Sequence, residues 1–312
     1  MKHHEIKAHD VTLHVVEESE SSENPSVLLC HGFPAIWSSW KFQMVTMAKA
    51  GYRVIAPDMR GYGRSSAPVD PDVYTPFHTV GDLVTILDAL EIETTTVVGH
   101  DFGANVAWNA AMMRPDRFTA VCGISVPYMA PGGDNFLDKL RAAGAHQFYM
   151  FEQIKEASDE AWRNAAVTIP GAYYWTSGEA PRETRWDPFD PSRGLLRPAP
   201  EPLLTFDSVY MEEAIREFTR TGFHGALNYY RAIDPFARHS AAFAIAKIKQ
   251  PSMFLMGELD GLNRVTQPNA ENMANDLLDL RSFKVLPEVG HWPQLEAPDA
   301  TSEAILSFIR NV

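Results

Sequence analysis

The spacing of apolar and polar residues divides the chain into short strands and amphipathic helices. Short apolar or alternating runs predict β-strands at residues 11–16, 26–30, 52–56, 94–98 and 118–124. Between them, apolar side chains recur at helical spacing in residues 79–90 and 104–113. Alternating strands and helices are typical of βαβ units, so the sequence predicts an α/β fold with a mostly parallel central sheet.

The pattern changes after this first stretch. Residues 129–241 contain no obvious buried strand and are rich in aromatic, charged and proline residues. Strand patterns resume at 252–256 and 281–286. The sequence therefore predicts one core built from residues 1–128 and 242–312, with residues 129–241 inserted as a cap.

Composition and charge limit the class of protein. With 45% hydrophobic and 21% charged residues, the chain is typical of a soluble globular protein. A net charge of -13 disfavours nucleic acid as a partner, because binding to phosphates needs a cationic surface. No run reaches the roughly 18 apolar residues that span a bilayer, and residues 1–5 lead into no apolar signal region. We therefore expect a cytoplasmic protein with no membrane partner.

The two cysteines carry no chemistry in this interpretation. Cys30 and Cys122 each lie inside an apolar run, which indicates buried free thiols rather than a disulfide or a metal site. We expect neither a metal nor another cofactor.

The most informative string surrounds Asp101. It follows a predicted strand and opens a predicted helix, and glycines lie two residues before and two residues after it, at Gly99 and Gly103. A strained strand-to-helix turn that carries a nucleophile needs such small neighbours. Asp101 is therefore the candidate nucleophile, and the alternative is a simple helix cap.

A second string, His31-Gly32-Phe33-Pro34, follows an earlier strand and is the candidate oxyanion hole. The expected donors are two backbone N–H groups, those of Phe33 and of Phe102, the residue after the nucleophile. An ordinary strand-ending turn is the alternative, and the sequence leaves open whether the Phe33-Pro34 bond is cis.

A histidine after the last predicted strand is the candidate general base. Most of the 11 histidines need have no role, but His291 can reach over the carboxyl end of the sheet toward Asp101. The strand at 252–256 ends near two acids, Glu258 and Asp260. We expect Asp260 to hydrogen-bond one ring nitrogen of His291, which leaves the other free to take a proton from water, with Glu258 as the alternative acid.

These strings together resemble the epoxide hydrolases of the α/β-hydrolase superfamily. The likeness covers nearly the full chain and rests on GHDFG at 99–103, HGFP at 31–34, GYGRSS at 61–66 and GHW at 290–292, with the nucleophile, acid and histidine in the same chain order. The resemblance implies an α/β-hydrolase core with an inserted helical cap.

The resemblance also implies two cap residues that hydrogen-bond the epoxide oxygen. By register these are Tyr230, with Tyr229 as the alternative, and His146, with Tyr149 as the alternative. His146 is a departure, because the family usually has a tyrosine there. Trp40, Gln147, Tyr149 and Trp292 are candidates for lining the substrate pocket.

The implied reaction proceeds through a covalent ester. Asp101 attacks an epoxide carbon, and His291 then activates a water molecule that hydrolyses the ester to a vicinal diol. The expected partners are a small, mainly apolar epoxide and water, and a homodimer is compatible with this reaction.

Two other functions stay open. A dehalogenase uses the same ester chemistry, but haloalkane dehalogenases commonly have tryptophan and asparagine where this chain has Phe102 and Phe33, and the arginine of fluoroacetate-type enzymes is missing after Asp101. The other alternative is a ligand-binding member of the fold without catalysis.

Overall fold

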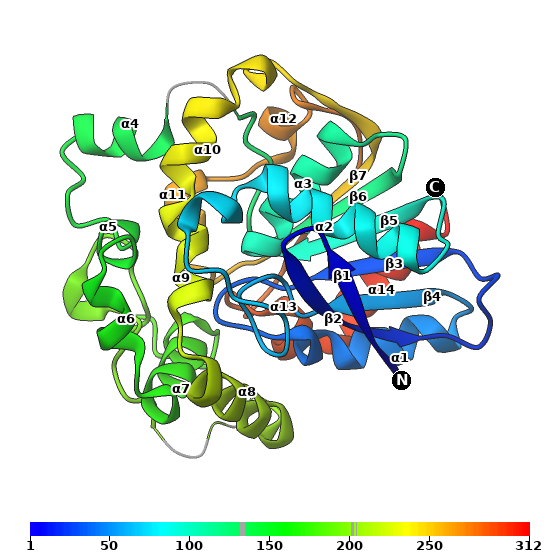
Figure 1. Cartoon of the computed structure of the whole chain (residues 1–312). Coiled ribbons are helices and arrows are strands. Elements are labelled where there is room, and N and C mark those ends of the chain that lie inside the picture. The colour runs from blue at the N-terminus through cyan, green and yellow to red at the C-terminus, as the bar shows by residue number, and fades with distance from the viewer. Residues whose placement is uncertain (132–134, 201–202, 204) are drawn as a thin grey trace.

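A mostly parallel sheet occupies the centre of the computed structural model (Figure 1). The structure describes residues 1–131, 135–200, 203 and 205–312. In these ranges the strands are β1 (Lys2–Ala8), β2 (Val11–Glu18), β3 (Ser26–Cys30), β4 (Arg53–Pro57), β5 (Thr95–His100), β6 (Phe118–Ile124), β7 (Ile248–Gly257) and β8 (Leu277–Leu286). They form one sheet in the order β1-β2-β4-β3-β5-β6-β7-β8. The β1–β2 and β2–β4 pairs are antiparallel and the other pairs are parallel, so the predicted sheet is confirmed.

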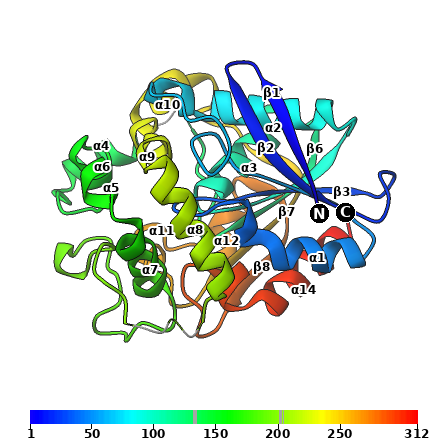
Figure 2. The same ribbon diagram turned by 60° about the horizontal axis from the view of Figure 1, so that its bottom comes forward.

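Helices cover both faces of this sheet. Figure 2 shows α2 (Pro76–Ala89) and α3 (Phe102–Met113) on one face, with α1 (Lys41–Lys49) and α14 (Pro298–Ile309) on the other. The shorter elements of the core are η1 (Trp37–Trp40), η2 (Pro71–Tyr74), η4 (Ala241–Phe243), α11 (Asn263–Thr266), α12 (Ala270–Met273) and α13 (Pro293–Glu296).

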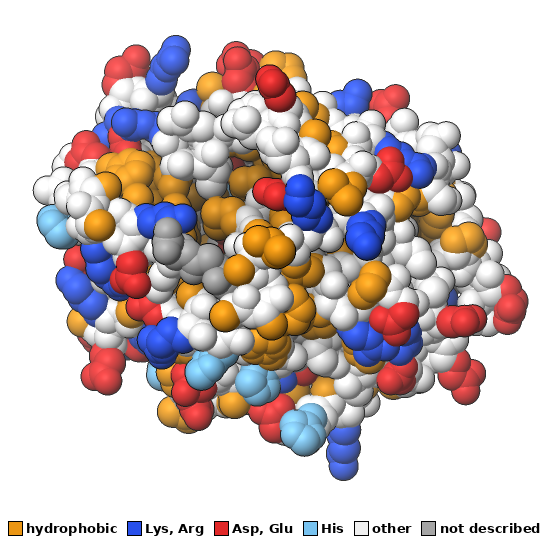
Figure 3. Space-filling model, turned by 90° about the horizontal axis from the view of Figure 1, so that it is seen from above, with side chains coloured by type: hydrophobic (Ala, Val, Ile, Leu, Met, Phe, Trp, Pro, Cys, Tyr) orange, Lys and Arg blue, Asp and Glu red, His pale blue; other side chains and the backbone are white. Residues whose placement is uncertain are grey.

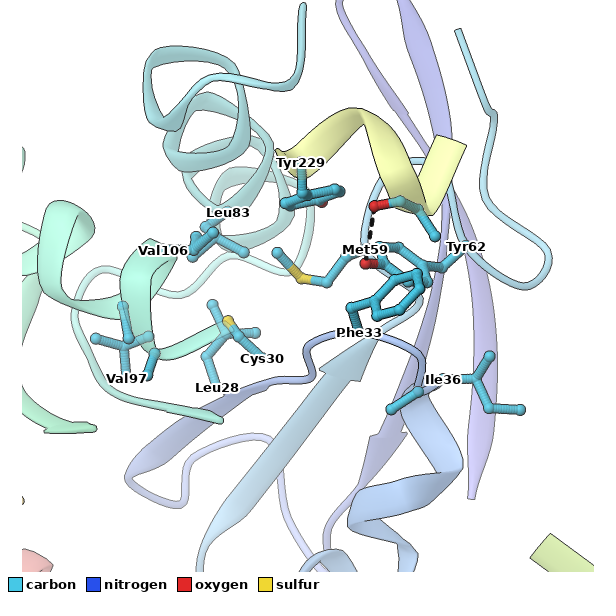
Figure 4. Packing of buried hydrophobic residues seen from close by; sticks show 14 of the residues in the cluster. Leu28, Cys30, Phe33, Ile36, Met59, Tyr62, Leu83, Val97, Val106 and Tyr229 are labelled. Atoms are coloured by element: carbon cyan, nitrogen blue, oxygen red, sulfur yellow. Dashed lines mark hydrogen bonds between the residues drawn. The ribbon is translucent and has the colours of Figure 1, made fainter. Parts of the chain in front are cut away.

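Strand β3 illustrates how the sequence produces two cores. Leu28 and Cys30 belong to the cluster under α2 and α3 (Figure 4), whereas Val27 and Leu29 belong to the cluster under α1 and α14. Successive side chains of a strand point to opposite faces, and a parallel strand covered on both faces is therefore apolar throughout. Both cysteines are buried and free, as predicted.

A helical segment is inserted between β6 and β7. Its elements are α4 (Phe136–Ala142), α5 (Met150–Gln153), α6 (Ala157–Trp162), α7 (Ala165–Thr176), η3 (Pro191–Arg193), α8 (Ser208–Thr221), α9 (His224–Arg231) and α10 (Ile233–His239). In Figure 1 these helices lie to the left of the sheet, from α4 and α10 at the top to α7 and α8 at the bottom. Tyr230 of α9 meets the ring of Phe102, just beyond the carboxyl end of β5, with 4.7 Å between ring centroids. The insertion is therefore a cap over the carboxyl ends of the strands, as the resemblance implied.

The strands differ from the prediction in several places, and β7, for example, begins at Ile248 rather than at residue 252. Strand β1 was not predicted, because it is an edge strand in which Ile6 and Ala8 alone are buried. Strand β8 begins at Leu277 rather than at residue 281. The mixed polar and apolar sequence of its first residues gives no strand pattern, although these residues pair with β7. No helix in the described ranges combines the length and the hydropathy needed to cross a bilayer.

Candidate active site

Asp101 lies in a strained turn between β5 and α3. Its φ of 55° and ψ of -121° fall in a region that side chains rarely adopt, and its carboxylate does not cap α3. A Cβ atom on Gly99 would lie 2.0 Å from the Gly103 carbonyl oxygen, and one on Gly103 would lie 2.1 Å from the Cys30 carbonyl oxygen. The two glycines therefore let the turn close, and the helix-cap alternative is excluded.

A backbone N–H group holds one oxygen of this carboxylate. The Phe33 N–H donates to Asp101 Oδ1 at 2.8 Å, and the Phe102 N–H lowers the pKa of the same carboxyl. Gly32 leaves room for this contact, because a Cβ there would lie 2.4 Å from Asp101 Oδ1. The Phe33-Pro34 bond is cis. The structure thus brings both predicted oxyanion-hole residues to Asp101.

His291 lies between two carboxylates. Its Nδ1 is 2.9 Å from Asp260 Oδ2, and its Nε2 is 3.7 Å from Asp101 Oδ2. Asp260 is buried, and its second oxygen accepts the Leu262 N–H at 2.9 Å. Glu258, the alternative acid, is exposed and accepts the Glu288 N–H instead. The structure therefore brings Asp101, Asp260 and His291 together.

The charges of these three groups are coupled. Burial raises the pKa of Asp101, and His291 together with the N–H groups of Phe33 and Phe102 only partly opposes this effect. Burial lowers the pKa of His291, but the carboxylates of Asp260 and Asp101 outweigh burial and raise it to about 9. His291 is thus held as a cation while Asp101 carries its negative charge.

A half-buried glutamate fixes the loop that carries His291. Glu296 Oε2 accepts the N–H groups of Gly178 at 2.8 Å and Gly290 at 2.9 Å, and Oε1 accepts that of Trp292 at 2.8 Å. The His291 N–H also donates to the Thr176 carbonyl at 2.9 Å. Sequence reasoning missed Glu296, because an acid after the histidine has no local pattern that distinguishes it from a surface acid.

Two cap tyrosines face Asp101. The rings of Tyr149 and Tyr230 meet edge to face with 6.1 Å between centroids, and both residues line the space around Asp101. Burial raises the pKa of both hydroxyls well above the usual value, so both keep their protons at neutral pH. The hydroxyl of Tyr229, the alternative to Tyr230, donates instead to the Arg60 carbonyl at 3.2 Å.

The prediction for His146 is corrected. His146 and Gln147 lie in an exposed turn between α4 and α5 and line no cavity at Asp101. Tyr149, the alternative donor, follows this turn, and its N–H donates to the Pro188 carbonyl at 2.8 Å. The turn directs His146 to solvent, and Tyr149 rather than His146 lines the space at Asp101.

Of the two tryptophan candidates for the substrate pocket, Trp292 lines the space at Asp101 and Trp40 does not. Trp292 is buried beside His291, where its ring stacks on Tyr173 with 4.0 Å between centroids. Trp40 is fully buried in the cluster under α1 and α14, so it is not a pocket residue. It follows the oxyanion loop closely in sequence, but η1 carries it to the opposite face of the sheet.

The free space at Asp101 is unequal on its two sides. A cavity of about 380 Å³ extends along α3 beneath α4 and α10, and a space of about 30 Å³ lies beside His291 and Trp292. Asp101, Tyr149 and Leu262 border both. Most residues lining the larger cavity are apolar, and hydrophobic side chains border a hollow in the face seen in Figure 3. An apolar substrate can therefore reach the nucleophile from the α3 side.

Comparisons with known proteins agree with this geometry. Residues 25–298 match the sequence model of the alpha/beta hydrolase fold. The chain is 49% identical to an epoxide hydrolase of Caballeronia sordidicola, over 100% of this chain and 94% of that protein. It is 36% identical to epoxide hydrolase 3 of Siraitia grosvenorii, over 99% and 98%. A solved epoxide hydrolase from an endophytic Streptomyces matches with a TM-score of 0.91 at 33% identity, over 99% of this chain and 95% of that one.

Proposed function

Since the chain belongs to the epoxide hydrolases of the α/β-hydrolase fold, we propose that it converts an epoxide and water to a vicinal diol through an ester on Asp101. One observation carries the proposal. The Asp101 carboxylate has one oxygen bound by the Phe33 N–H, while the other is near His291, and a pair of protonated tyrosines lines the same space.

In the first step Asp101 Oδ2 attacks an epoxide carbon. The new bond joins Oδ2 to carbon, and the ring C–O bond breaks. Tyr149 and Tyr230 donate hydrogen bonds to the ring oxygen, and one of them protonates it as it becomes an alkoxide. Their position beside Asp101 and their raised pKa support this role, which the sequence had assigned to Tyr230 and His146.

The tyrosinate left by the first step takes the proton of cationic His291, and in the second step the now neutral His291 takes a proton from water. The resulting hydroxide attacks the ester carbonyl carbon, and Asp101 Oδ1 becomes the oxyanion that the N–H groups of Phe33 and Phe102 stabilise. The tetrahedral intermediate then releases the diol, whose oxygen takes a proton from His291. Asp260 holds the ring of His291 through Nδ1, 2.9 Å away.

The dehalogenase alternative is not favoured. The matched relatives and structures are named epoxide hydrolases, and Phe102 and Phe33 offer no polar N–H side chain to a halide. A member without catalysis is also disfavoured, because His291 lies within hydrogen-bonding distance of Asp260 and within ion-pair distance of Asp101.

Several sequence predictions stay proposals. These are the cap boundaries at residues 129–241 with a core of 1–128 and 242–312, a cytoplasmic location, and a homodimer. The substrate is proposed to be mainly apolar, which the lining of the larger cavity supports. Nucleic acid stays an unfavoured partner because of the net charge of -13.

The test is to trap the ester. His291→Gln protein is incubated with panels of epoxides and haloalkanes and weighed, and the adduct is mapped by peptide sequencing. We expect epoxide-derived mass on Asp101, and in wild-type protein a single turnover in heavy-oxygen water should label Asp101 before the diol. The matched control is His146→Gln, which should turn over normally without an adduct. Halide release without diol formation, or an adduct elsewhere, would refute the proposal.

A further inference from the structure

The free space at Asp101 is closed on the side of His291. Its volume there is about 30 Å³, and of the twelve residues that line it all but Tyr149 are buried. We call this space the closed side. The larger cavity of about 380 Å³ reaches the surface instead, where Met129 of its lining is 45% exposed. An epoxide bound at Asp101 can therefore place a long substituent only on the α3 side.

Two apolar side chains from the cap form part of the wall of the closed side. Trp186 is 5% exposed and Leu195 is 9% exposed. The ring of Trp186 meets the ring of Tyr149 edge to face, with 5.0 Å between centroids. On the core, the ring lies against Gly261, where a Cβ atom would be 2.8 Å from the indole. Trp186 thus fills the space between a cap tyrosine and the loop that follows Asp260.

The segment around Trp186 is tied to its surroundings. The Trp186 N–H donates to the Trp175 carbonyl at 2.8 Å. The next residue, Asp187, forms ion pairs with Arg264 of the core and with Arg193, the latter at 3.5 Å. A substrate cannot push this wall aside without breaking these contacts, so the closed side is a fixed feature of the site.

The volume of the closed side limits what a substrate can place there. A space of about 30 Å³ holds about two water molecules. The hydrolytic water of the proposed reaction has to lie within reach of His291, which lines this space. What remains is room for about one methyl group, which is about as large as a water molecule. A longer substituent would have to displace the hydrolytic water or overlap the wall.

We propose that the substrate is an epoxide with one long apolar substituent, whose other ring carbon bears hydrogen or at most a methyl group, and that Trp186 and Leu195 impose this limit. The inference rests on the proposed function, because the epoxide ring has to lie at Asp101. Epoxides at the end of an alkyl chain satisfy the limit, and epoxides in the middle of a chain do not.

The test compares two racemic isomers with the same atoms and the same substitution of the ring. In the methyl isomer, trans-2,3-epoxyoctane, the shorter substituent is methyl, and in the propyl isomer, trans-4,5-epoxyoctane, both substituents are propyl. The measured quantity is the ratio of kcat/KM for the methyl isomer to kcat/KM for the propyl isomer. We expect a ratio of about 100, because each of two further methylenes in a filled apolar site should cost about tenfold. A ratio near one would overturn the inference.

Two variants test the assignment to the wall. Trp186→Ala and Leu195→Ala should each lower the ratio by about tenfold, because propyl then occupies the space that the side chain leaves. The ratio is taken within one protein, so a general loss of activity cancels. The control is Leu196→Ala, which should keep the wild-type ratio, because Leu196 is partly buried but lines neither space. A ratio that neither wall variant lowers, or that Leu196→Ala lowers as much, would overturn the assignment.

A binding measurement separates this inference from the proposed function. The diols that correspond to the two isomers are titrated into wild-type and Trp186→Ala protein by calorimetry. If neither isomer is turned over but the diol of the methyl isomer binds about tenfold more tightly and loses this advantage in the variant, the reaction is wrong and the closed side stands. If both isomers are hydrolysed with equal kcat/KM, the reaction stands and the closed side is wrong. Without turnover, equal binding of the two diols would overturn the closed side as well.

Discussion

The charge on Asp101 should control the proton affinity of His291 during the reaction. In the free protein the pKa of His291 is about 9, because Asp260 and Asp101 together outweigh the effect of burial. When Asp101 becomes an ester it loses its charge, so the pKa of His291 should fall as the base is needed. Asp101→Asn reproduces this loss with a side chain of the same shape.

The distance between Asp101 and His291 sets how far the pKa of His291 should fall when Asp101 loses its charge. Asp101 Oδ2 and His291 Nε2 are 3.7 Å apart. Unit charges at about 4 Å interact by about 4 kcal/mol at an effective dielectric constant near 20, and one pH unit corresponds to about 1.4 kcal/mol. No hydrogen bond joins the two atoms, and the larger influence on His291 is that of Asp260, so Asp101→Asn should lower its titration midpoint by about one to three pH units.

The assay is NMR titration of ring-labelled histidine, with the His291 signal assigned by its loss in His291→Gln. Asp279→Asn, which removes an exposed carboxylate, is the control and should leave the midpoint near 9. A midpoint that Asp101→Asn leaves unchanged would refute the coupling. Single-turnover kinetics extend the test, since ester hydrolysis should speed up as the pH rises through the lowered pKa, because neutral His291 is the base.

The remaining predictions concern Tyr149 and Tyr230 of the cap, the loop that carries His291, and the turn at Asp101. Tyr149→Phe and Tyr230→Phe should each slow ester formation by roughly 100-fold in stopped-flow fluorescence, because each removes a proton donor. A variant that forms the ester at the wild-type rate would contradict this role. Glu296→Gln should lower the free energy of unfolding in urea by about 2 kcal/mol, because the hydrogen bonds to its charged carboxylate weaken, and an unchanged value would contradict this. Gly103→Ala should destabilise the fold by about 3 kcal/mol because its Cβ meets backbone, whereas Gly81→Ala, which meets nothing within 4 Å, should not destabilise it.

The core of the site could be predicted because its local sequences have geometric causes. Gly99 and Gly103 are required by a turn too tight for a Cβ atom, and this requirement is visible without a structure. The carboxyl ends of parallel strands meet at one edge of the sheet, so loops distant in sequence, those of Asp101, Asp260 and His291, converge there.

The cap could not be predicted in the same detail. Helix α5 is only four residues long, so helical periodicity gives no register for the segment before it, and His146 was chosen over Tyr149. Trp40 was misplaced for a related reason, because a short 3₁₀ turn decides to which face of the sheet its ring points. Positions set by irregular turns have no repeating signal in the sequence.

The cap and the catalytic loop are joined at the α7 end. The His291 N–H donates to the Thr176 carbonyl, Trp292 Nε1 donates to Thr176 Oγ1 at 2.7 Å, and Glu296 binds Gly178 of the cap and the loop at once. A rotation that lifts α7 away from the core would break these hydrogen bonds and displace the base. Substrate should therefore enter beside α4 and α10, where the larger cavity lies, so that His291 keeps its position while the cap admits the epoxide.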